Sequence, residues 1–156
     1  MSPPHVWTRV NEAADVLLIA DAYRWAHVPL DDVRLLVKSG FADPQDSWGP
    51  EPQRQLDLAR GSAALLARRF REAGIGCVID DAIFPSGPEP GYPAWSEELR
   101  GVPHGLVVLL PTLETIIERN HGREGNRRLA PEMLTTIYEM MTPWRDKAVP
   151  IIDNSD

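Results

Sequence analysis

Four aspartates in this 156-residue chain lie at the carboxyl ends of stretches that read as β-strands. Asp31 and Asp32 follow one such stretch, while Asp80 ends another and Asp81 follows it. In open parallel sheets, ligands bind at the carboxyl ends of the strands. Carboxylates at that edge could hold Mg²⁺ or act as acid and base. We expect functional roles for Asp31 and Asp81, whereas Asp32 and Asp80 fit structural roles; the alternative is that all four cap helices or face solvent.

Basic and aromatic side chains form a second group of candidates. The guanidinium fork of arginine suits phosphate and carboxylate, so the arginines after residue 118 form either an anion clamp or an ordinary solvated loop. Aromatic residues in the long loops near the predicted edge could line a pocket. The candidates are Arg119, Arg123, Arg127, Arg128, Trp48, Trp95 and Tyr92. His27, His104 and His121 lack the spacing of a metal site, so no metal is expected.

The elements that must position these side chains alternate along the chain. Strands are predicted at 26–30, 76–80, 106–110 and 149–152, with a short strand-prone stretch at 6–10. Helices are predicted at 12–24, 31–38, 52–73, 94–100, 111–120 and 131–141. Alternating strands and helices indicate an α/β fold with a three-layer parallel sheet of about four to five strands. Pro29 places its strand at a sheet edge, where a missing N–H costs least.

Length and composition favour one soluble domain over residues 1–156. The formal charge is −7 with both signs well mixed, so neither nucleic acid nor an anionic membrane is an expected partner. Cys77 is the only cysteine, so no internal disulfide can form, and a cytoplasmic location fits. No basic segment followed by an apolar run resembles a signal peptide.

Four stretches in this order resemble the P-loop small-molecule kinases of the chloramphenicol phosphotransferase, zeta-toxin and gluconate-kinase type. They are VPLDDVR (28–34), GCVIDD (76–81), VVLL (107–110) and VPIID (149–153). The resemblance covers roughly residues 15–155. It implies that Asp31, in the family's D-[DS]-x-R signature, accepts the proton of a substrate hydroxyl and that Arg34 contacts substrate or phosphate. It also implies that the arginines at 119–128 belong to a lid and that residues 153–155 lie beside adenine.

The phosphate-binding loop of that family is missing from the sequence. No G-x-x-x-x-G-K-[ST] motif precedes the first predicted helix, although its amides and lysine hold the phosphates of ATP. Alignment with the family puts Glu12 at the lysine position, and a carboxylate there repels phosphate. A parallel sheet cannot leave a central gap with unpaired backbone groups. We therefore expect residues 5–10 to fill the gap and enter the helix at Asn11, unless a partner chain supplies the strand.

Three functions are compatible with the sequence. The leading one is a degenerate P-loop-kinase-like protein that has lost ordinary ATP binding and keeps a small-molecule pocket near Asp31, Arg34 and Asp81, with acid/base chemistry if it is an enzyme. The second is an active phosphotransferase acting on a small-molecule hydroxyl. The third is a structural or oligomerising remnant. A cofactor, Mg-ATP, is expected only under the second, and a homodimer is expected because a degenerate first strand leaves surface to cover.

Overall fold

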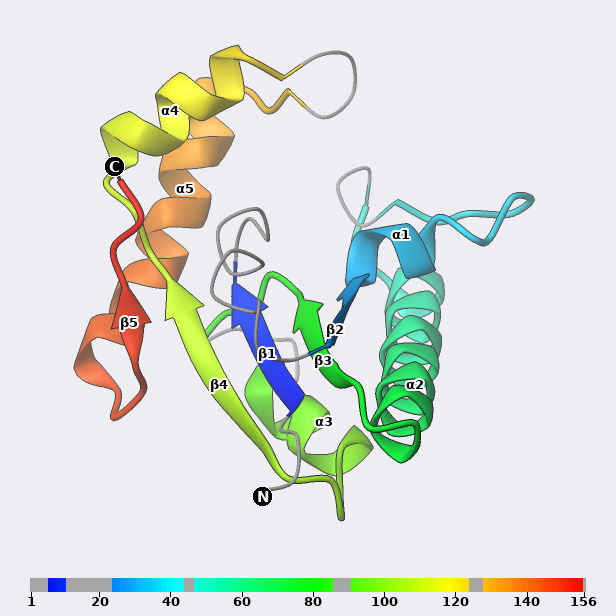
Figure 1. The fold of residues 1–156 in the computed structure, drawn as a ribbon. Coiled ribbons are helices and arrows are strands. Elements are labelled where there is room, and N and C mark those ends of the chain that lie inside the picture. The colour runs from blue at the N-terminus through cyan, green and yellow to red at the C-terminus, as the bar shows by residue number, and fades with distance from the viewer. Residues whose placement is uncertain (1–5, 11–23, 44–46, 86–90, 124–127, 156) are drawn as a thin grey trace.

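The computed structural model describes the backbone of residues 6–10 together with residues 24–43, 47–85, 91–123 and 128–155. The strands are β1 (Val6–Val10), β2 (Trp25–Pro29), β3 (Gly76–Asp80), β4 (His104–Leu109) and β5 (Ile151–Ile152). The helices are α1 (Leu30–Arg34), α2 (Pro50–Glu72), α3 (Gly91–Glu98), α4 (Leu113–His121), α5 (Pro131–Met141) and the 3₁₀ helix η3 (Thr142–Asp146). Figure 1 shows that the strands point the same way. The prediction of an α/β fold built on parallel strands is confirmed.

The strand order is β2-β3-β1-β4-β5. β1 lies between β3 and β4, where Thr8 is in register with Ile79 on one side and Leu106 on the other. This is the position that the sequence predicts for residues 5–10, and it leaves the backbone groups of both neighbours paired. β2 is an edge strand, and Pro29 is its last residue, as expected for a residue without an N–H.

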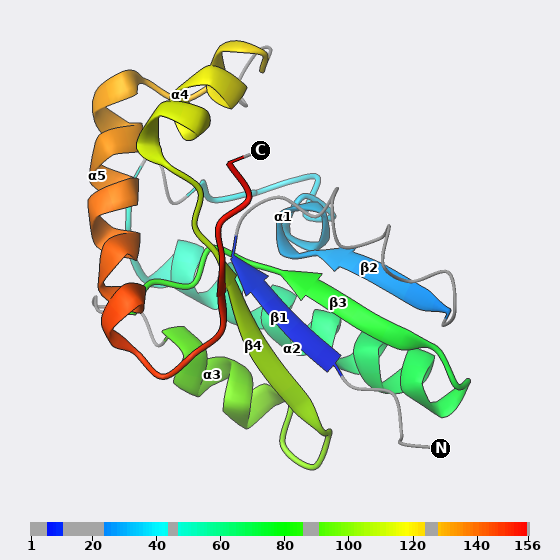
Figure 2. The same cartoon turned by 60° about the vertical axis from the view of Figure 1, so that its left-hand side comes forward.

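Helix α2 covers one face of the sheet because its inward side is built from small side chains. Leu56, Ala59, Ala63 and Ala67 recur at helical spacing and are buried against the sheet. Figures 1 and 2 show α2 and α3 on the same face of the strands. The residues predicted as a helix at 12–24, which would cover the opposite face of a three-layer fold, lie outside the described part of the chain apart from Arg24.

Four helices differ from their predicted bounds. α2 spans Pro50–Glu72 rather than 52–73, and the other three differ for local reasons. α1 begins at Leu30 and ends at Arg34; extended Pro29 precedes it, so Asp31 and Asp32 lie in its first turn rather than capping it. α4 begins at Leu113 rather than at 111, because the Thr112 hydroxyl caps it by accepting a hydrogen bond from the amide of Thr115. α3 begins at Gly91 rather than at 94, because a proline in the first helical turn gives up no helical hydrogen bond.

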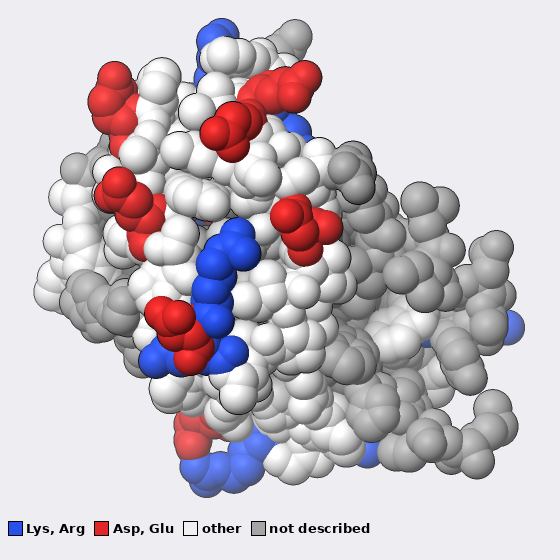
Figure 3. All heavy atoms as spheres, turned by 90° about the vertical axis from the view of Figure 1, so that its left-hand side faces the viewer, with Lys and Arg blue, Asp and Glu red and all other residues white. Residues whose placement is uncertain are grey.

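Figure 3 looks onto the face that lies on the left in Figure 1, where acidic and basic side chains are scattered among uncharged ones. Among the described helices, none is both long enough and apolar enough to cross a membrane.

Candidate functional site

Asp81 follows the last residue of β3 and, among the residues that the structure describes, is the most buried carboxylate at the carboxyl edge of the sheet. Its side chain keeps 9% of its surface exposed. The indole Nε1 of Trp95, on α3, donates a hydrogen bond to Asp81 Oδ2 over 2.7 Å. The Arg60 Nε atom, on α2, lies 3.5 Å from the same oxygen. Two helices therefore converge on one carboxylate oxygen.

Burial raises the pKa of Asp81 above its ordinary value of 3.8. The positive charge of Arg60 and the hydrogen bond from Trp95 lower this pKa, but they do not cancel the effect of burial. The negative charge of Asp31 raises the pKa of Asp81 further, so the two carboxylates lie close enough to interact. A carboxyl group that holds its proton to a higher pH than usual is suited to acid/base chemistry.

Arg60 is the residue of this site that the sequence analysis missed. Its side chain is 1% exposed, and its Nη1 atom lies 3.9 Å from Oδ1 of Asp57, one turn earlier on α2. A buried guanidinium requires compensating carboxylates, and Asp57 and Asp81 supply two. The sequence does indicate that Arg60 is buried. Arg60 lies among the alanines of the apolar face of α2, and that face is turned away from solvent.

The loop that leaves Asp81 is also fixed from the far end of the chain. The indole Nε1 of Trp144, in η3, donates to the backbone oxygen of Ile83 over 2.8 Å. Both side chains are buried in the core. Because this bond joins residues far apart in the sequence, no local pattern predicts it.

Asp31 is the exposed carboxylate of the site and is paired with the largely buried Arg34. Arg34 Nη1 donates to Asp31 Oδ1 over 3.1 Å, with side-chain exposures of 16% for Arg34 and 84% for Asp31. The guanidinium of Arg34 lies over the ring of Phe41, 5.7 Å from its centroid. The structure thus brings together four of the predicted residues, Asp31, Arg34, Asp81 and Trp95, at one edge of the sheet.

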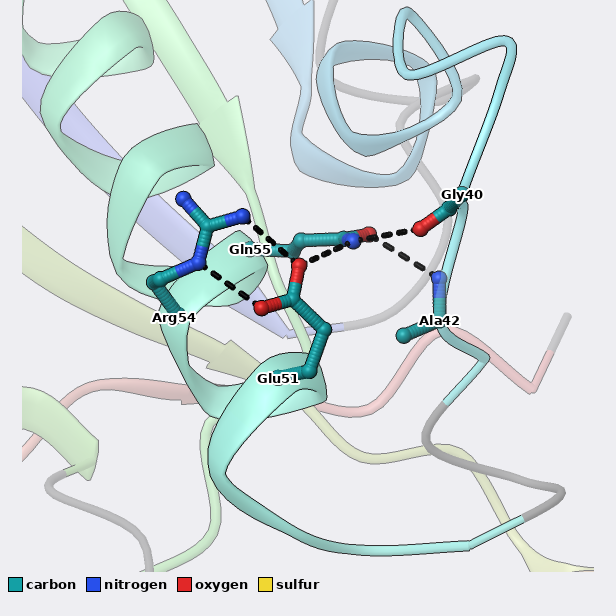
Figure 4. A network of polar contacts seen from close by, with 5 residues as sticks. All are labelled: Gly40, Ala42, Glu51, Arg54 and Gln55. Carbon is teal, nitrogen blue, oxygen red and sulfur yellow. Dashed lines mark hydrogen bonds and ion pairs between the residues drawn. The ribbon is translucent and has the colours of Figure 1, made fainter.

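The segment carrying Phe41 is tied to the start of α2 by a polar network, shown in Figure 4. Buried Gln55 accepts a hydrogen bond from the amide of Ala42 over 3.0 Å and donates to the carbonyl of Gly40 over 2.7 Å. Gly40 has a φ of +75°, a conformation that glycine adopts at little cost. The side chain of Gln55 thereby replaces backbone partners for Gly40 and Ala42, which make no backbone hydrogen bond within the described part of the chain.

Glu51 completes this network from the first turn of α2. It accepts hydrogen bonds from Gln55 and from both Nε and Nη2 of Arg54, at 2.8, 2.8 and 2.7 Å. Hydrogen bonds from Arg54 and then Gln55 lower the pKa of Glu51 to about 2. The negative charge also suits the positive end of the helix dipole.

The other predicted residues are not brought to Asp31 and Asp81 by any described contact. Trp48 is exposed in the segment before α2. The ring of Tyr92 lies 6.3 Å from that of His104, which begins β4 at the opposite end of the strands from Asp81. The proposed pocket-lining role of Tyr92 therefore has no support in its position.

The arginines after residue 118 have separate surroundings. Arg119 donates a hydrogen bond to the backbone oxygen of Asn154, and the Thr112 amide donates to Ser155 Oγ over 2.8 Å, so both hold the segment after β5. Arg123 is half-buried and Arg128 is exposed, while Arg127 lies outside the described residues.

Asn120 joins the two ends of this arginine segment, a role that the sequence did not reveal. It is buried, and its side chain makes two hydrogen bonds to the backbone of Leu129, each 2.9 Å long. The amide group thereby replaces a strand partner for Leu129.

A histidine and an aspartate form a second polar pair near the same edge. His27 Nε2, on the edge strand β2, contacts Asp80 Oδ2 at the end of β3, and both side chains are about a quarter exposed. The sequence assigned Asp80 a structural role, and its pairing with His27 agrees with that role. Within the described part of the chain, no cluster of three or more His, Cys, Asp or Glu side chains could hold a metal ion.

Comparisons with known proteins show similarity in fold alone. No family model matches the sequence, and no curated protein matches it. Among solved structures, a gluconokinase from Sinorhizobium meliloti gives a TM-score of 0.58 at 15% identity, covering 99% of this chain and 84% of that one. A tunicamycin resistance protein from Deinococcus radiodurans gives 0.58 at 15%, covering 97% and 86%. A sugar kinase from a Janibacter species gives 0.54 at 17%, also covering 97% and 86%. The chain therefore has a P-loop-kinase-like fold.

Proposed function

We propose that this protein binds a small molecule at the carboxyl edge of a P-loop-kinase-like sheet and has lost the ordinary kinase mode of ATP binding. The sequence contains no G-x-x-x-x-G-K-[ST] motif, and the resemblance to the P-loop kinases puts Glu12 where they have the phosphate-binding lysine. Without the glycine-loop amides and the ammonium group, the triphosphate loses its main protein partners.

The observation that carries the proposal is the proximity of two carboxylates with opposite environments. Asp31 is exposed, whereas Asp81 is nearly buried and has a raised pKa, partly because of the charge of Asp31. Pairs of titratable groups with different environments are the usual mark of acid/base sites. Asp31 would accept a proton from a ligand hydroxyl, and Arg34 would orient it.

Calorimetry with Mg-ATP tests the loss of ATP binding. We expect no binding tighter than about 1 mM. Micromolar affinity, about −8 kcal/mol, would contradict the proposal.

The Asp31→Asn variant tests the site itself. Because Asp31 is 84% exposed, its surface ion pair contributes at most about 1 kcal/mol, and the melting temperature should hardly change. Ligand binding should weaken markedly. Asp32→Asn is the matched control, since Asp32 is the exposed neighbour in the same helical turn. Equal ligand affinity in both variants would show that Asp31 does not contribute to ligand binding.

An active phosphotransferase is the second candidate, supported by the fold shared with a gluconokinase and a sugar kinase. In this case Asp31 would be the general base for the attacking hydroxyl. A coupled assay for ADP release with a panel of hydroxyl-bearing compounds distinguishes the two candidates. Turnover that disappears in Asp31→Asn, but not in Asp32→Asn, would favour the phosphotransferase.

A further inference from the structure

The side of α2 that faces away from the sheet carries leucines that the fold leaves exposed. Leu58, Leu65 and Leu66 keep 57%, 65% and 43% of their surface accessible. Figure 1 shows α2 at the side of the molecule, with the sheet on one side of it only. Leu58 and Leu65 are two turns apart, so both point in nearly the same direction at about 100° per residue. A row of exposed leucines is typical of a surface that another protein covers.

The exposed face of α2 has a midpoint about which its residue types are mirrored. Gly61 and Ser62 lie at this midpoint and are its smallest residues. Leu58 comes before the midpoint and Leu65 after it, at equal distances along the helix. Such a face is self-complementary under a two-fold rotation, because residue i of one copy meets residue j of the other wherever j meets i. The mirrored order therefore fits a second copy of this chain.

The mirrored order continues in charged pairs outside the leucines. Arg54 pairs with Glu51 at 2.7 Å, and Arg69 pairs with Glu72 at 2.9 Å. These four charges cancel, although the whole chain carries −7. A nucleic acid or an anionic membrane would need a surplus of positive charge, so neither fits this face. Two copies of an acidic chain repel one another least where their surfaces are neutral.

The midpoint allows two helices to approach closely without burying an unmatched polar group. Ser62 Oγ donates a hydrogen bond to the carbonyl oxygen of Leu58 over 2.8 Å, so the hydroxyl is satisfied within its own helix. Gly61 has no side chain to keep the helices apart. An inclined crossing, the commonest class in globular proteins, packs the flanking leucines together and turns the helix ends away from each other. The charged pairs at the two ends then stay in solvent.

We propose that α2 pairs antiparallel with α2 of a second copy, about a two-fold axis between Gly61 and Ser62, and that Leu58 packs against the partner's Leu65. The helix dipoles favour this direction, because they repel in a parallel pair and attract in an antiparallel one. The interface is separate from the ligand site, since Arg60 lies on the inner side of α2 and is 1% exposed.

Sedimentation of the unmodified chain establishes the oligomeric state. An interface made by one pair of helices is small, so we expect a dissociation constant in the micromolar range and a dimer at about 10 μM. A monomer at that concentration would overturn the proposal. A monomer that floats with anionic phosphatidylglycerol vesicles would assign the leucines to a membrane instead, and this result would also overturn it.

Cysteine crosslinking tests the position of the axis. Ser62→Cys should form a disulfide between two copies, because both copies of residue 62 lie beside the axis. Arg69→Cys is the matched control, since antiparallel pairing separates its two copies by about 22 Å, too far for a disulfide. Buried Cys77 stays in every variant.

The control also measures accidental contact. Arg69 is 84% exposed, so random collisions would crosslink position 69 at least as readily as half-buried position 62. Crosslinking of Ser62→Cys alone supports the proposal. Crosslinking of both variants, as a parallel pair would give, of Arg69→Cys alone, or of neither variant would overturn it.

Leu58→Lys and Leu65→Glu test which leucines face each other. Both variants should fold, as circular dichroism would check, because each leucine is more than half exposed. Each variant alone should dimerise at least about 10-fold more weakly, because a charge then faces a leucine. An equimolar mixture should form a heterodimer, in which the new lysine of one chain faces the new glutamate of the other. A mixture that stays monomeric while the unmodified chain dimerises would overturn the proposal. Two variants that unfold would do the same, since the leucines would then belong to the fold of a single chain.

Discussion

Replacing Arg60 by methionine should destabilise the protein through Asp81, and the loss should depend on pH. The substitution keeps most of the volume of a side chain that is 1% exposed but removes its charge. The Asp81 carboxylate would then remain buried with Trp95 as its one hydrogen-bond partner among the described residues. Breaking a buried ion pair from one side costs about 3–5 kcal/mol, because the other charge is left uncompensated.

The cost cannot exceed the free energy of protonating Asp81, because the folded variant can bind a proton instead of keeping an unmatched buried charge. Protonating a carboxyl group with the ordinary pKa of 3.8 at about pH 7 costs roughly 4 kcal/mol. The limit is lower here because burial has already raised the pKa of Asp81. We therefore expect Arg60→Met to lose about 3 kcal/mol of unfolding free energy near pH 7.

The sign of the pH dependence follows from linkage. Loss of Arg60 raises the folded-state pKa of Asp81 further above the unfolded value, so the folded variant binds the proton more tightly. Stability of the variant then falls as the pH rises from the unfolded pKa towards the folded pKa, and it recovers on acidification. Between about pH 7 and pH 5 the deficit should shrink by up to roughly 2.7 kcal/mol.

Urea unfolding of four proteins measures this effect: the unmodified chain, Arg60→Met, Asp81→Asn and the double variant. Because the double variant leaves no buried charge unmatched, it should be at least about 1 kcal/mol more stable than the sum of the single losses predicts. Arg69→Met, in an exposed pair, should lose less than about 0.5 kcal/mol at either pH. An Arg60→Met deficit that is the same at both pH values, or that persists unchanged in the Asp81→Asn background, would refute the reasoning.

Four further predictions concern other parts of the molecule. Glu51→Gln should remove a stabilisation that is present above about pH 4.5 and is lost as the pH falls towards about 2, which acid unfolding followed by fluorescence would detect. Thr8→Pro should abolish soluble folding, because β1 is paired on both sides and proline donates no ladder bond; soluble, folded protein would argue against the central position of β1. Cys77 is buried and its thiol pKa is raised to about 11, so alkylation in native buffer should be slower than in urea by orders of magnitude. Light scattering should report a homodimer, since α2 exposes Leu58, Leu65 and Leu66; a monomer at about 10 μM would contradict this.

The sequence by itself determined the elements whose signals are local. Gly76–Asp80 and Pro131–Met141 have the bounds that apolar runs, glycine and proline predict. The edge position of β2 followed from Pro29, whose missing N–H is a property of one residue. The meeting of Asp31 and Asp81 also followed from sequence, because parallel strands bring their carboxyl ends to one edge.

Most contacts between side chains from separate elements, unlike the approach of Asp31 to Asp81, depend on how the helices pack on the sheet. Arg60 and Trp95 meet at one oxygen of Asp81 only because α2 and α3 pack on the same face of the sheet. Tyr92, which is near Trp95 in sequence, points instead to His104 at the other end of the strands. A helix turns its successive side chains by about 100° per residue, so neighbours in sequence face different partners, and packing alone selects which of them reaches the site.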